Sequence, residues 1–405
     1  MGDFLKVDIL IAHPGKHHVL HLVAGCIKSG ASVSYVTPFY RCGVGSLVDL
    51  LPGSVGSKAK GYFHPNIPPR SIVSPMIWQI RKLISFINNN LQYERGFDNY
   101  VARKIEEGRY KFKVLVTLQD YMPNTVRAAK RLGYIIWTDQ ISNQCDEMAS
   151  RVIRHERALG LNIPWKHSEE NNNEIIAVSN MITVPSTYCL DGIRQRIYPH
   201  NRVKIIPYGA SKDQFELKHT DDPHRVVILA RAQSLRKGGH LLLMALMQCG
   251  GALLELVKPK KIKVIILGRL EPLLCNLLAK LILPGGLSIE HGNVPHVKVG
   301  QLYQHASLFV VPSLSEGMSL ACIEALHSGL PLIITSYCGI DGFKNGEMGY
   351  EIADTVESLA NALVNAFNNQ HQWQLWRMNA KYFSKDLTWD LYEANISQLA
   401  RGLIS

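Results

Sequence analysis

The 405-residue sequence predicts an α/β protein with two doubly wound domains, each built on a parallel sheet. Residues 7–36 read as strand, polar loop, helix and strand, and residues 308–334 repeat that order. The length suits two or three domains at about 100–200 residues each, and the 46% apolar content can fill large cores. Parallel strands joined by helices place their loops at the carboxyl edge of the sheet, where ligands bind in such folds.

In the first half, elements are predicted from short apolar runs bounded by turn residues. Strands are expected at 7–12, 32–36, 113–118, 134–137 and 181–186, and helices at 19–29, 76–92, 125–132, 151–157 and 168–178. Residues 43–75 are rich in Gly, Pro and Ser, which predicts a long irregular connection. The helix at 76–92 is amphipathic, and packing on its own domain is favoured over contact with a membrane surface.

The second half repeats the alternation of strands and helices. Strands are expected at 225–230, 264–268, 287–290, 308–312 and 332–334, and helices at 240–248, 299–305, 318–327, 358–367 and, as a closing helix, about 388–405. Ser315 is the expected N-cap of the helix at 318–327, and Gly329 is its expected end.

Two carboxylates lie at the start and middle of that helix. Glu316 and Glu324 are eight residues apart and can project toward one ligand. The backbone N–H groups of residues 317–320 are expected to be unpaired donors suited to an anion. Such a pair alone more often marks a solvated helix face, so its flanks must decide the interpretation.

The flanking residues resemble a known signature. Glu316-Gly317-Met318-Ser319-Leu320, Glu324-Ala325-Leu326 and Ser328-Gly329-Leu330-Pro331-Leu332 are similar to the E-x7-E motif of retaining GT-B glycosyltransferases, specifically glycosyltransferase family 4. The usual spelling is close to EGFGLxxLEAMAxGxPV, so Met318 and Ser319 replace a frequent Phe and Gly. The resemblance implies the GT-B fold, in which two Rossmann-like domains face each other across a cleft.

Other stretches resemble motifs of the same family. Ala230-Arg231 with Lys237-Gly238-Gly239 is similar to its GRLxxxKG segment, and His291-Gly292-Asn293-Val294 to its xGxV loop. Val203–Gly209 is similar to the VIPNGV crossing between domains. The resemblance therefore implies an acceptor-binding domain at 1–207 and a nucleotide-sugar-binding domain at 208–387. The closing helix at about 388–405 would pack back on the first domain.

The resemblance also implies roles for particular residues. Arg231 and Lys237 would stabilise the leaving diphosphate, Glu324 would bind the ribose hydroxyls, and Glu316 would lie near the transferred sugar. The remaining donor-binding candidates, drawn from the motif loops, are Gly317, Met318, Ser319, Leu320, Gly292, Val294 and Gly15. Asp139 is a candidate near the reaction centre, although a turn or N-cap role explains it equally well.

The expected reaction is retaining transfer of a sugar from a UDP- or GDP-type donor to a hydroxyl of a glycan or lipid-linked acceptor. No cofactor and no metal are expected. His17 and His21 have a spacing that could suit a metal, but no Glu general base lies between them, and helix packing and loop hydrogen bonds are favoured. A nucleotide-sugar isomerase or phosphorylase, a soluble enzyme with a small acceptor, and a non-enzymatic binding protein remain alternatives.

Charge and cysteines indicate where the protein works. The net charge is +11, and residues 1–207 hold 26 Lys/Arg against 16 Asp/Glu, while the rest hold 18 against 17. No nucleic-acid motif accompanies this basic half, so an anionic membrane or acidic glycan is the expected partner. The side chains of interest at a membrane are Trp78, Arg81, Lys82, Arg103, Lys104 and Arg109. The eight scattered cysteines, the opening MGDFLKVDIL and the expected lack of a transmembrane helix predict a cytoplasmic protein. The basic first half favours peripheral contact at the inner membrane face slightly over a soluble enzyme whose basic cleft binds an acidic glycan or small acceptor.

Overall fold

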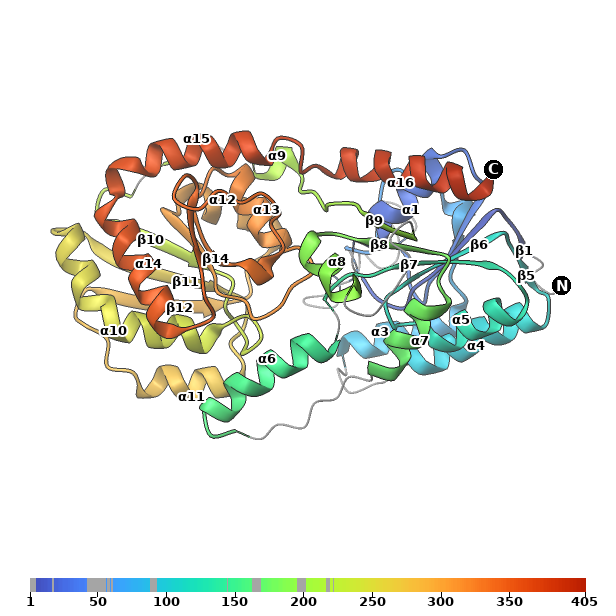
Figure 1. The fold of residues 1–405 in the computed structure, drawn as a ribbon, viewed down its shortest axis with the longest axis horizontal. Coiled ribbons are helices and arrows are strands. Elements are labelled where there is room, and N and C mark those ends of the chain that lie inside the picture. The colour runs from blue at the N-terminus through green and yellow to red at the C-terminus, as the bar shows by residue number, and fades with distance from the viewer. Residues whose placement is uncertain are drawn as a thin grey trace.

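The computed structural model describes residues 5–16, 18–41, 56, 59, 61–87, 93–143, 145–161, 169–194, 202–215, 219–220 and 222–405. Three stretches discussed above lie outside these residues: His17, most of 43–60 in the expected irregular connection, and 88–92 at the end of the helix expected at 76–92. The chain forms two α/β units that lie side by side, with both termini on the first (Figure 1).

The first unit is built on a seven-stranded parallel sheet in the order β4-β3-β2-β6-β7-β8-β9. Its strands are β2 (Ile9–Ala12), β3 (Val33–Val36), β4 (Ile72–Val73), β6 (Val114–Leu118), β7 (Ile135–Asp139), β8 (Met181–Val184) and β9 (Val203–Ile205). A separate parallel pair joins β1 (Leu5–Lys6) to β5 (Tyr110–Lys111). The strand order reverses between β2 and β6, which makes the carboxyl edge there the expected ligand position.

The second unit carries a six-stranded parallel sheet in the order β12-β11-β10-β13-β14-β15. Its strands are β10 (Arg225–Ala230), β11 (Lys261–Leu267), β12 (Leu287–Gly292), β13 (Leu308–Val311), β14 (Leu332–Thr335) and β15 (Gly349–Ile352). The order reverses between β10 and β13. These central strands read as unbroken apolar runs because both of their faces are buried under helices.

Helices cover both faces of each sheet (Figure 1). In the first unit they are α1 (Val19–Lys28), α3 (Met76–Ile87), α4 (Glu94–Glu106), α5 (Pro123–Arg131), α7 (Glu169–Val178) and α8 (Thr187–Arg194). The helix α6 (Cys145–Ala158) reaches across to the second unit, where Met148 and Val152 are part of the core. The later helices are α9 (Lys212–Phe215), α10 (Gly239–Val257), α11 (Pro272–Lys280), α12 (His296–His305), α13 (Leu320–His327), α14 (Val356–Asn368), α15 (Trp373–Ser384) and α16 (Trp389–Ile404). The prediction of two Rossmann-like domains is confirmed.

Several helices were not predicted, and one begins later than expected. α4, α8, α11 and α15 are absent from the sequence-based assignment. The polar, Gly-containing start of α4 at 94–99 hides its helical periodicity. In α4 the side chains of Phe97, Val101 and Ile105 are buried at helical spacing, so tertiary packing outweighs weak propensity. The N-cap of α13 is Ser319 rather than Ser315.

Helix α10 is long and apolar enough to cross a membrane by length and composition, although no such helix was expected. In the structure 56% of its apolar window is buried. Leu242, Leu246 and Leu253 are fully enclosed, and the helix lies beside α14 against the second sheet (Figure 1). Packing as a core helix therefore accounts for its composition.

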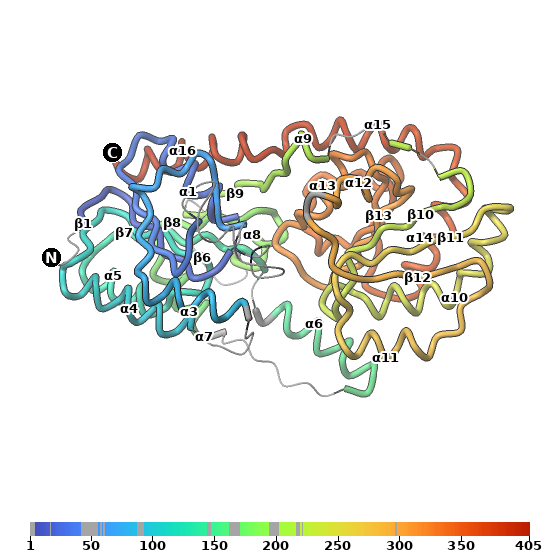
Figure 2. The backbone as a smooth tube through the Cα atoms, turned by 180° about the vertical axis from the view of Figure 1, so that it is seen from behind, coloured from blue at the N-terminus to red at the C-terminus, as the bar shows by residue number. Residues whose placement is uncertain are grey.

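The closing helix α16 runs back from the second unit onto the first, where it lies along α1 (Figures 1 and 2). The Thr388 side chain caps it by accepting the Leu391 N–H at 3.2 Å. A side chain at Gly25 of α1 would bring its Cβ within 2.7 Å of the Cβ of Ile396. Glycine at this position lets the two helices approach closely.

Candidate active site

A cavity of about 870 Å³ opens between the two units. Arg231 follows β10 directly, and the loop carrying Glu316 follows β13, so both come from the point where the second sheet reverses its order. On the opposite wall, Lys16 and His18 follow β2 of the first sheet. The cavity thus lies at the carboxyl edges of both sheets, the position expected of a ligand site in doubly wound domains.

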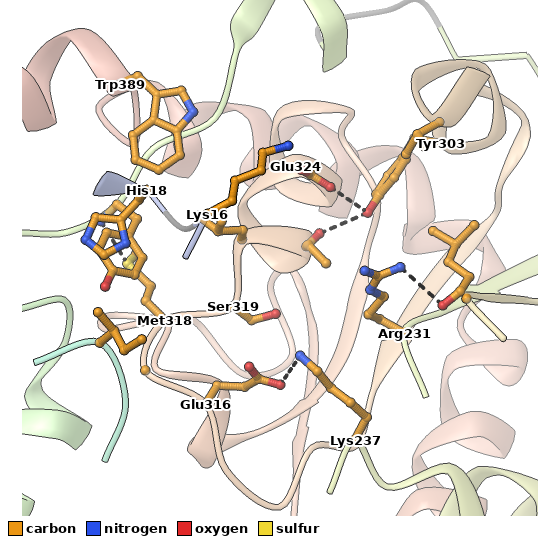
Figure 3. Close-up of a pocket in the computed structure, with 18 of the residues that line it drawn as sticks. Lys16, His18, Arg231, Lys237, Tyr303, Glu316, Met318, Ser319, Glu324 and Trp389 are labelled. Carbon is orange, nitrogen blue, oxygen red and sulfur yellow. Dashed lines mark hydrogen bonds and ion pairs between the residues drawn. The ribbon is translucent and has the colours of Figure 1, made fainter. Parts of the chain in front are cut away.

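Glu316 is held by cations from the loop after β10. Its carboxylate pairs with the Lys237 ammonium (Figure 3), and Arg236 lies 3.6 Å away. The Ser313 hydroxyl donates to it at 2.8 Å. Burial alone would raise the pKa of Glu316, but Lys237 and Arg236 hold it at about 2. Glu316 is therefore ionised across the physiological pH range.

Glu324 occupies a different electrostatic environment, on the helix α13 that follows the Glu316 loop. The Tyr303 hydroxyl of α12 lies 3.2 Å from its carboxylate (Figure 3). Burial raises the pKa of Glu324 to about 7, and Arg231 and the hydrogen bond from Tyr303 only partly oppose this. A nearly buried carboxylate with one hydrogen-bond donor has unused acceptor capacity directed at the cavity wall that it lines.

Arg231 and the N-terminus of α13 add positive potential to the same wall. Nη1 of Arg231 donates to the Leu267 carbonyl at 3.2 Å, which fixes the guanidinium at the cavity. Leu320 and Ala321 begin α13 and line the cavity, so the positive end of the helix dipole faces it. The row of unpaired backbone N–H groups at 317–320 is shorter than predicted, because the Ser319 N–H donates to the Cys338 carbonyl at 2.9 Å.

The motif loop also touches the first unit. A Cβ at Gly317 would lie 1.9 Å from the Ile141 carbonyl oxygen, so only glycine fits at this contact. The Ser186 hydroxyl donates to the Gly317 carbonyl at 2.6 Å, and the backbone N–H of Tyr208 points at the Met318 sulfur 3.3 Å away. Gly317 and Met318 therefore line the cavity and also hold the second-domain loop against the first domain.

The first-domain wall is aromatic and basic. His18 contacts Tyr208 with ring centroids 4.2 Å apart and the rings tilted by 37°, and Trp389 of α16 stacks on His21 at 4.0 Å. Asp139 ends β7 but is not part of the described cavity wall: its Oδ2 lies 2.5 Å behind the His18 Nε2. The structure thus places Asp139 one residue back from the cavity, where it orients His18.

The predicted residues separate into two groups by position. Those that line the cavity together are Arg231, Lys237, Val294, Glu316, Gly317, Met318, Ser319, Leu320 and Glu324. Gly15 and Gly292 are not in the described wall, although the residues that follow them, Lys16 and Asn293, are.

Sequence reasoning missed several residues at the site. Tyr303, Tyr208 and Trp389 lie in stretches that resemble family motifs, but those motifs gave no role to these side chains. Arg236 precedes the predicted Lys237 and was overlooked because only one cation was sought there. No sequence motif pointed to His18, and its place in the loop after the first strand was the available indication.

The second domain matches a glycosyltransferase family. Residues 223–369 match the family described as "Glycosyl transferases group 1". A sucrose synthase of Melioribacter roseus is 22% identical over 343 residues, covering 74% of this chain and 42% of the relative. This chain therefore spans less than half the length of that curated relative.

Solved structures extend the likeness to both domains. Sucrose-phosphate synthase of Thermosynechococcus elongatus superposes with a TM-score of 0.62 at 15% identity, covering 98% of this chain and 99% of the other. Anabaena Alr3699/HepE, solved with UDP and glucose, gives 0.65 at 13% identity, covering 97% and 99%. At such identities the likeness establishes the fold, which is GT-B.

Proposed function

We propose that this protein is a retaining glycosyltransferase that moves a sugar from a nucleoside diphosphate, UDP being the first candidate, to an acceptor hydroxyl. One observation carries the proposal: Arg231, Lys237, Glu316 and Glu324 converge on one interdomain cavity. Two cations and a helix N-terminus suit a diphosphate, and a buried carboxylate suits a ribose diol. The group 1 match and the UDP complex of the HepE protein support the donor class.

The donor side has a distinct task for each charged group. Glu324 accepts hydrogen bonds from the two ribose hydroxyls. Arg231 and Lys237 neutralise the charge that grows on the diphosphate as the glycosidic bond breaks, the kind of preorganised stabilisation that lowers a barrier most. These cations supply the charge that a divalent metal would otherwise contribute, so the transfer step itself is expected to need no added Mg²⁺ or Mn²⁺.

The sugar and its acceptor meet at the centre of the cavity. Glu316 binds hydroxyls of the transferred sugar or stabilises positive charge at C1. His18, held by Asp139, and Lys16 form the first-domain wall where the acceptor binds. Asp139 is then a positioning residue that fixes the tautomer of His18 rather than a group that touches the sugar.

Product stereochemistry is the direct test. Incubation with a panel of UDP- and GDP-sugars and candidate glycan acceptors should release nucleoside diphosphate only when an acceptor is present. NMR of the new linkage should show that the α configuration of the donor is kept. A β-linked product from an α-donor would contradict the retaining assignment. Diphosphate released without acceptor would instead favour the isomerase or phosphorylase alternative.

We further propose that the first domain contacts an anionic membrane through α3, which would bring the enzyme to a lipid-linked acceptor. The structure changes the residues expected to do this: Trp78 and Lys82 are buried, and Lys82 donates to the Tyr93 hydroxyl. The exposed apolar residues of α3 are instead Met76, Ile77, Ile80 and Ile84. With the basic surplus of residues 1–207, this face suits an anionic bilayer.

Co-sedimentation with phosphatidylserine vesicles tests the membrane contact. Binding should need anionic lipid and weaken as salt rises. The double substitution Ile77→Asp and Ile80→Asp should reduce the bound fraction at least about tenfold, since each buried isoleucine contributes about 1.5–3 kcal/mol. The matched control, Leu375→Asp with Met378→Asp, alters two exposed residues of α15 and should bind normally. Wild-type protein that stays in the supernatant at low salt would overturn the proposal.

A further inference from the structure

Two histidines and a glutamate meet at one point at the edge of the cavity, whose wall includes one of the histidines, and the transfer mechanism uses none of them. His21 is on α1, His64 is in the segment before β4, and Glu393 is on the closing helix α16. His21 Nδ1 lies 2.8 Å from Glu393 Oε1 and 3.2 Å from His64 Nε2. The third side of this triangle, from His64 Nε2 to Glu393 Oε1, is 3.3 Å.

This triangle has the dimensions of one face of a tetrahedral metal site. Zinc binds His nitrogen and carboxylate oxygen at about 2.0–2.2 Å, which puts neighbouring ligand atoms of a tetrahedron roughly 3.3 Å apart. Two of the three sides match this value, and the 2.8 Å side is a hydrogen bond that a cation would replace. Two imidazoles with one carboxylate form a recurrent zinc ligand set that leaves a fourth position open.

The surrounding contacts hold the three groups in place. The Trp389 ring stacks on His21 at an interplanar angle of 3°, and the Tyr40 hydroxyl contacts the backbone N–H and carbonyl of His64, each at 3.1 Å. Lys28 lies 2.5 Å from Glu393 Oε2, which leaves Oε1 for the triangle. One contact must change on metal binding: the Asn66 N–H points at His64 Nδ1 at 3.3 Å, and a metal-bound His64 carries its proton there.

We propose that His21, His64 and Glu393 form a divalent-metal site, with Zn²⁺ the preferred ion, that fastens the closing helix α16 to the first domain. The ligands come from positions separated by 43 and 329 residues, so the site joins three segments of the chain. Its ligands come from the first domain and α16, whereas the proposed diphosphate cations Arg231 and Lys237 follow β10 of the second domain. Its proposed effect is on the docking of α16, with the fourth position left to water, and the proposal does not depend on the sugar-transfer reaction.

Metal stoichiometry on the full-length, untagged protein tests the site. Chelated and dialysed protein should take up about one Zn²⁺ per chain by elemental analysis, and its Tm should rise with added Zn²⁺. His64→Ala should lose both effects. His240→Ala is the matched control, because it removes a comparably buried histidine paired with His155 at 3.0 Å and should keep the bound zinc.

Cobalt substitution provides a readout that needs no variant. Co²⁺ should give the visible absorption of a tetrahedral complex without the near-ultraviolet band of cysteine ligation. Uptake well below one equivalent, an octahedral or cysteine-bound spectrum, or equal uptake by His64→Ala would overturn the site and leave a metal-free hydrogen-bond cluster. Loss of sugar transfer on chelation that added Mg²⁺ restores and added Zn²⁺ does not would instead contradict the metal-free diphosphate mechanism, so the two proposals can fail separately.

Discussion

Lys237→Met is expected to reduce kcat about 100- to 1,000-fold, the effect of removing one preorganised donor from a developing negative charge. It should also destabilise the fold, because the Glu316 side chain, only 11% exposed, loses its principal partner. The depressed pKa of about 2 against an ordinary value of 4.5 corresponds to roughly 3 kcal/mol of stability at neutral pH. That stability is present above about pH 4.5 and is lost as the pH falls toward 2.

A double substitution separates the two effects. Adding Glu316→Gln to Lys237→Met removes the unpaired charge, so urea unfolding should show most of the lost stability restored, while transfer stays abolished. Lys258→Met is the control, since Lys258 pairs with Glu255 on the exposed surface at 2.6 Å and should change neither property. Near wild-type turnover by Lys237→Met would show that the diphosphate binds elsewhere.

The second domain was more predictable from sequence than the first because its strands and motif loops coincide. The run before Pro312 predicts β13, and the acids that follow it lie on the predicted cavity wall. Local pattern is sufficient there, since parallel strands buried on both faces have unmistakable apolar runs. Helix α4 was not predicted for the opposite reason. Its local sequence pattern is weak, and its stability comes from burial of Phe97 and Val101 in the folded domain.

The sequence did not predict which residues far apart in the chain contact each other at the site. Asp139 was a candidate for the reaction centre, with a turn or N-cap role as the equal alternative, but no local signal shows that His18, 121 residues earlier, lies between it and the cavity. Trp78 and Lys82 were candidates for membrane contact, yet both are buried: Trp78 packs on Phe97 of α4, and Lys82 donates to the Tyr93 hydroxyl just before that helix. Only the three-dimensional contacts decide which face of an amphipathic helix is buried.

Glu324→Gln is expected to raise the donor KM roughly 10- to 100-fold, because hydrogen bonds to a charged group contribute about 1.5–3 kcal/mol. It should also make the protein more stable at pH 8. Burial raises the pKa of Glu324 in the folded protein to about 7 from an ordinary 4.5, so the folded state binds the extra proton. Stability therefore falls between about pH 4.5 and 7, and the ionised carboxylate costs up to about 3 kcal/mol above that range.

The pH dependence of catalysis should run in the opposite direction. If the ionised carboxylate accepts the ribose hydroxyls, kcat/KM for the donor should rise with pH up to about 7 and then level off, because this parameter reports the free enzyme. The Glu324→Gln variant should lose that rise, and Glu347→Gln, which alters an exposed acid of the same domain, should keep it. A carboxylate with only a structural role would change stability without changing the kcat/KM profile. An unchanged profile in Glu324→Gln, together with a wild-type KM, would therefore remove Glu324 from the donor site.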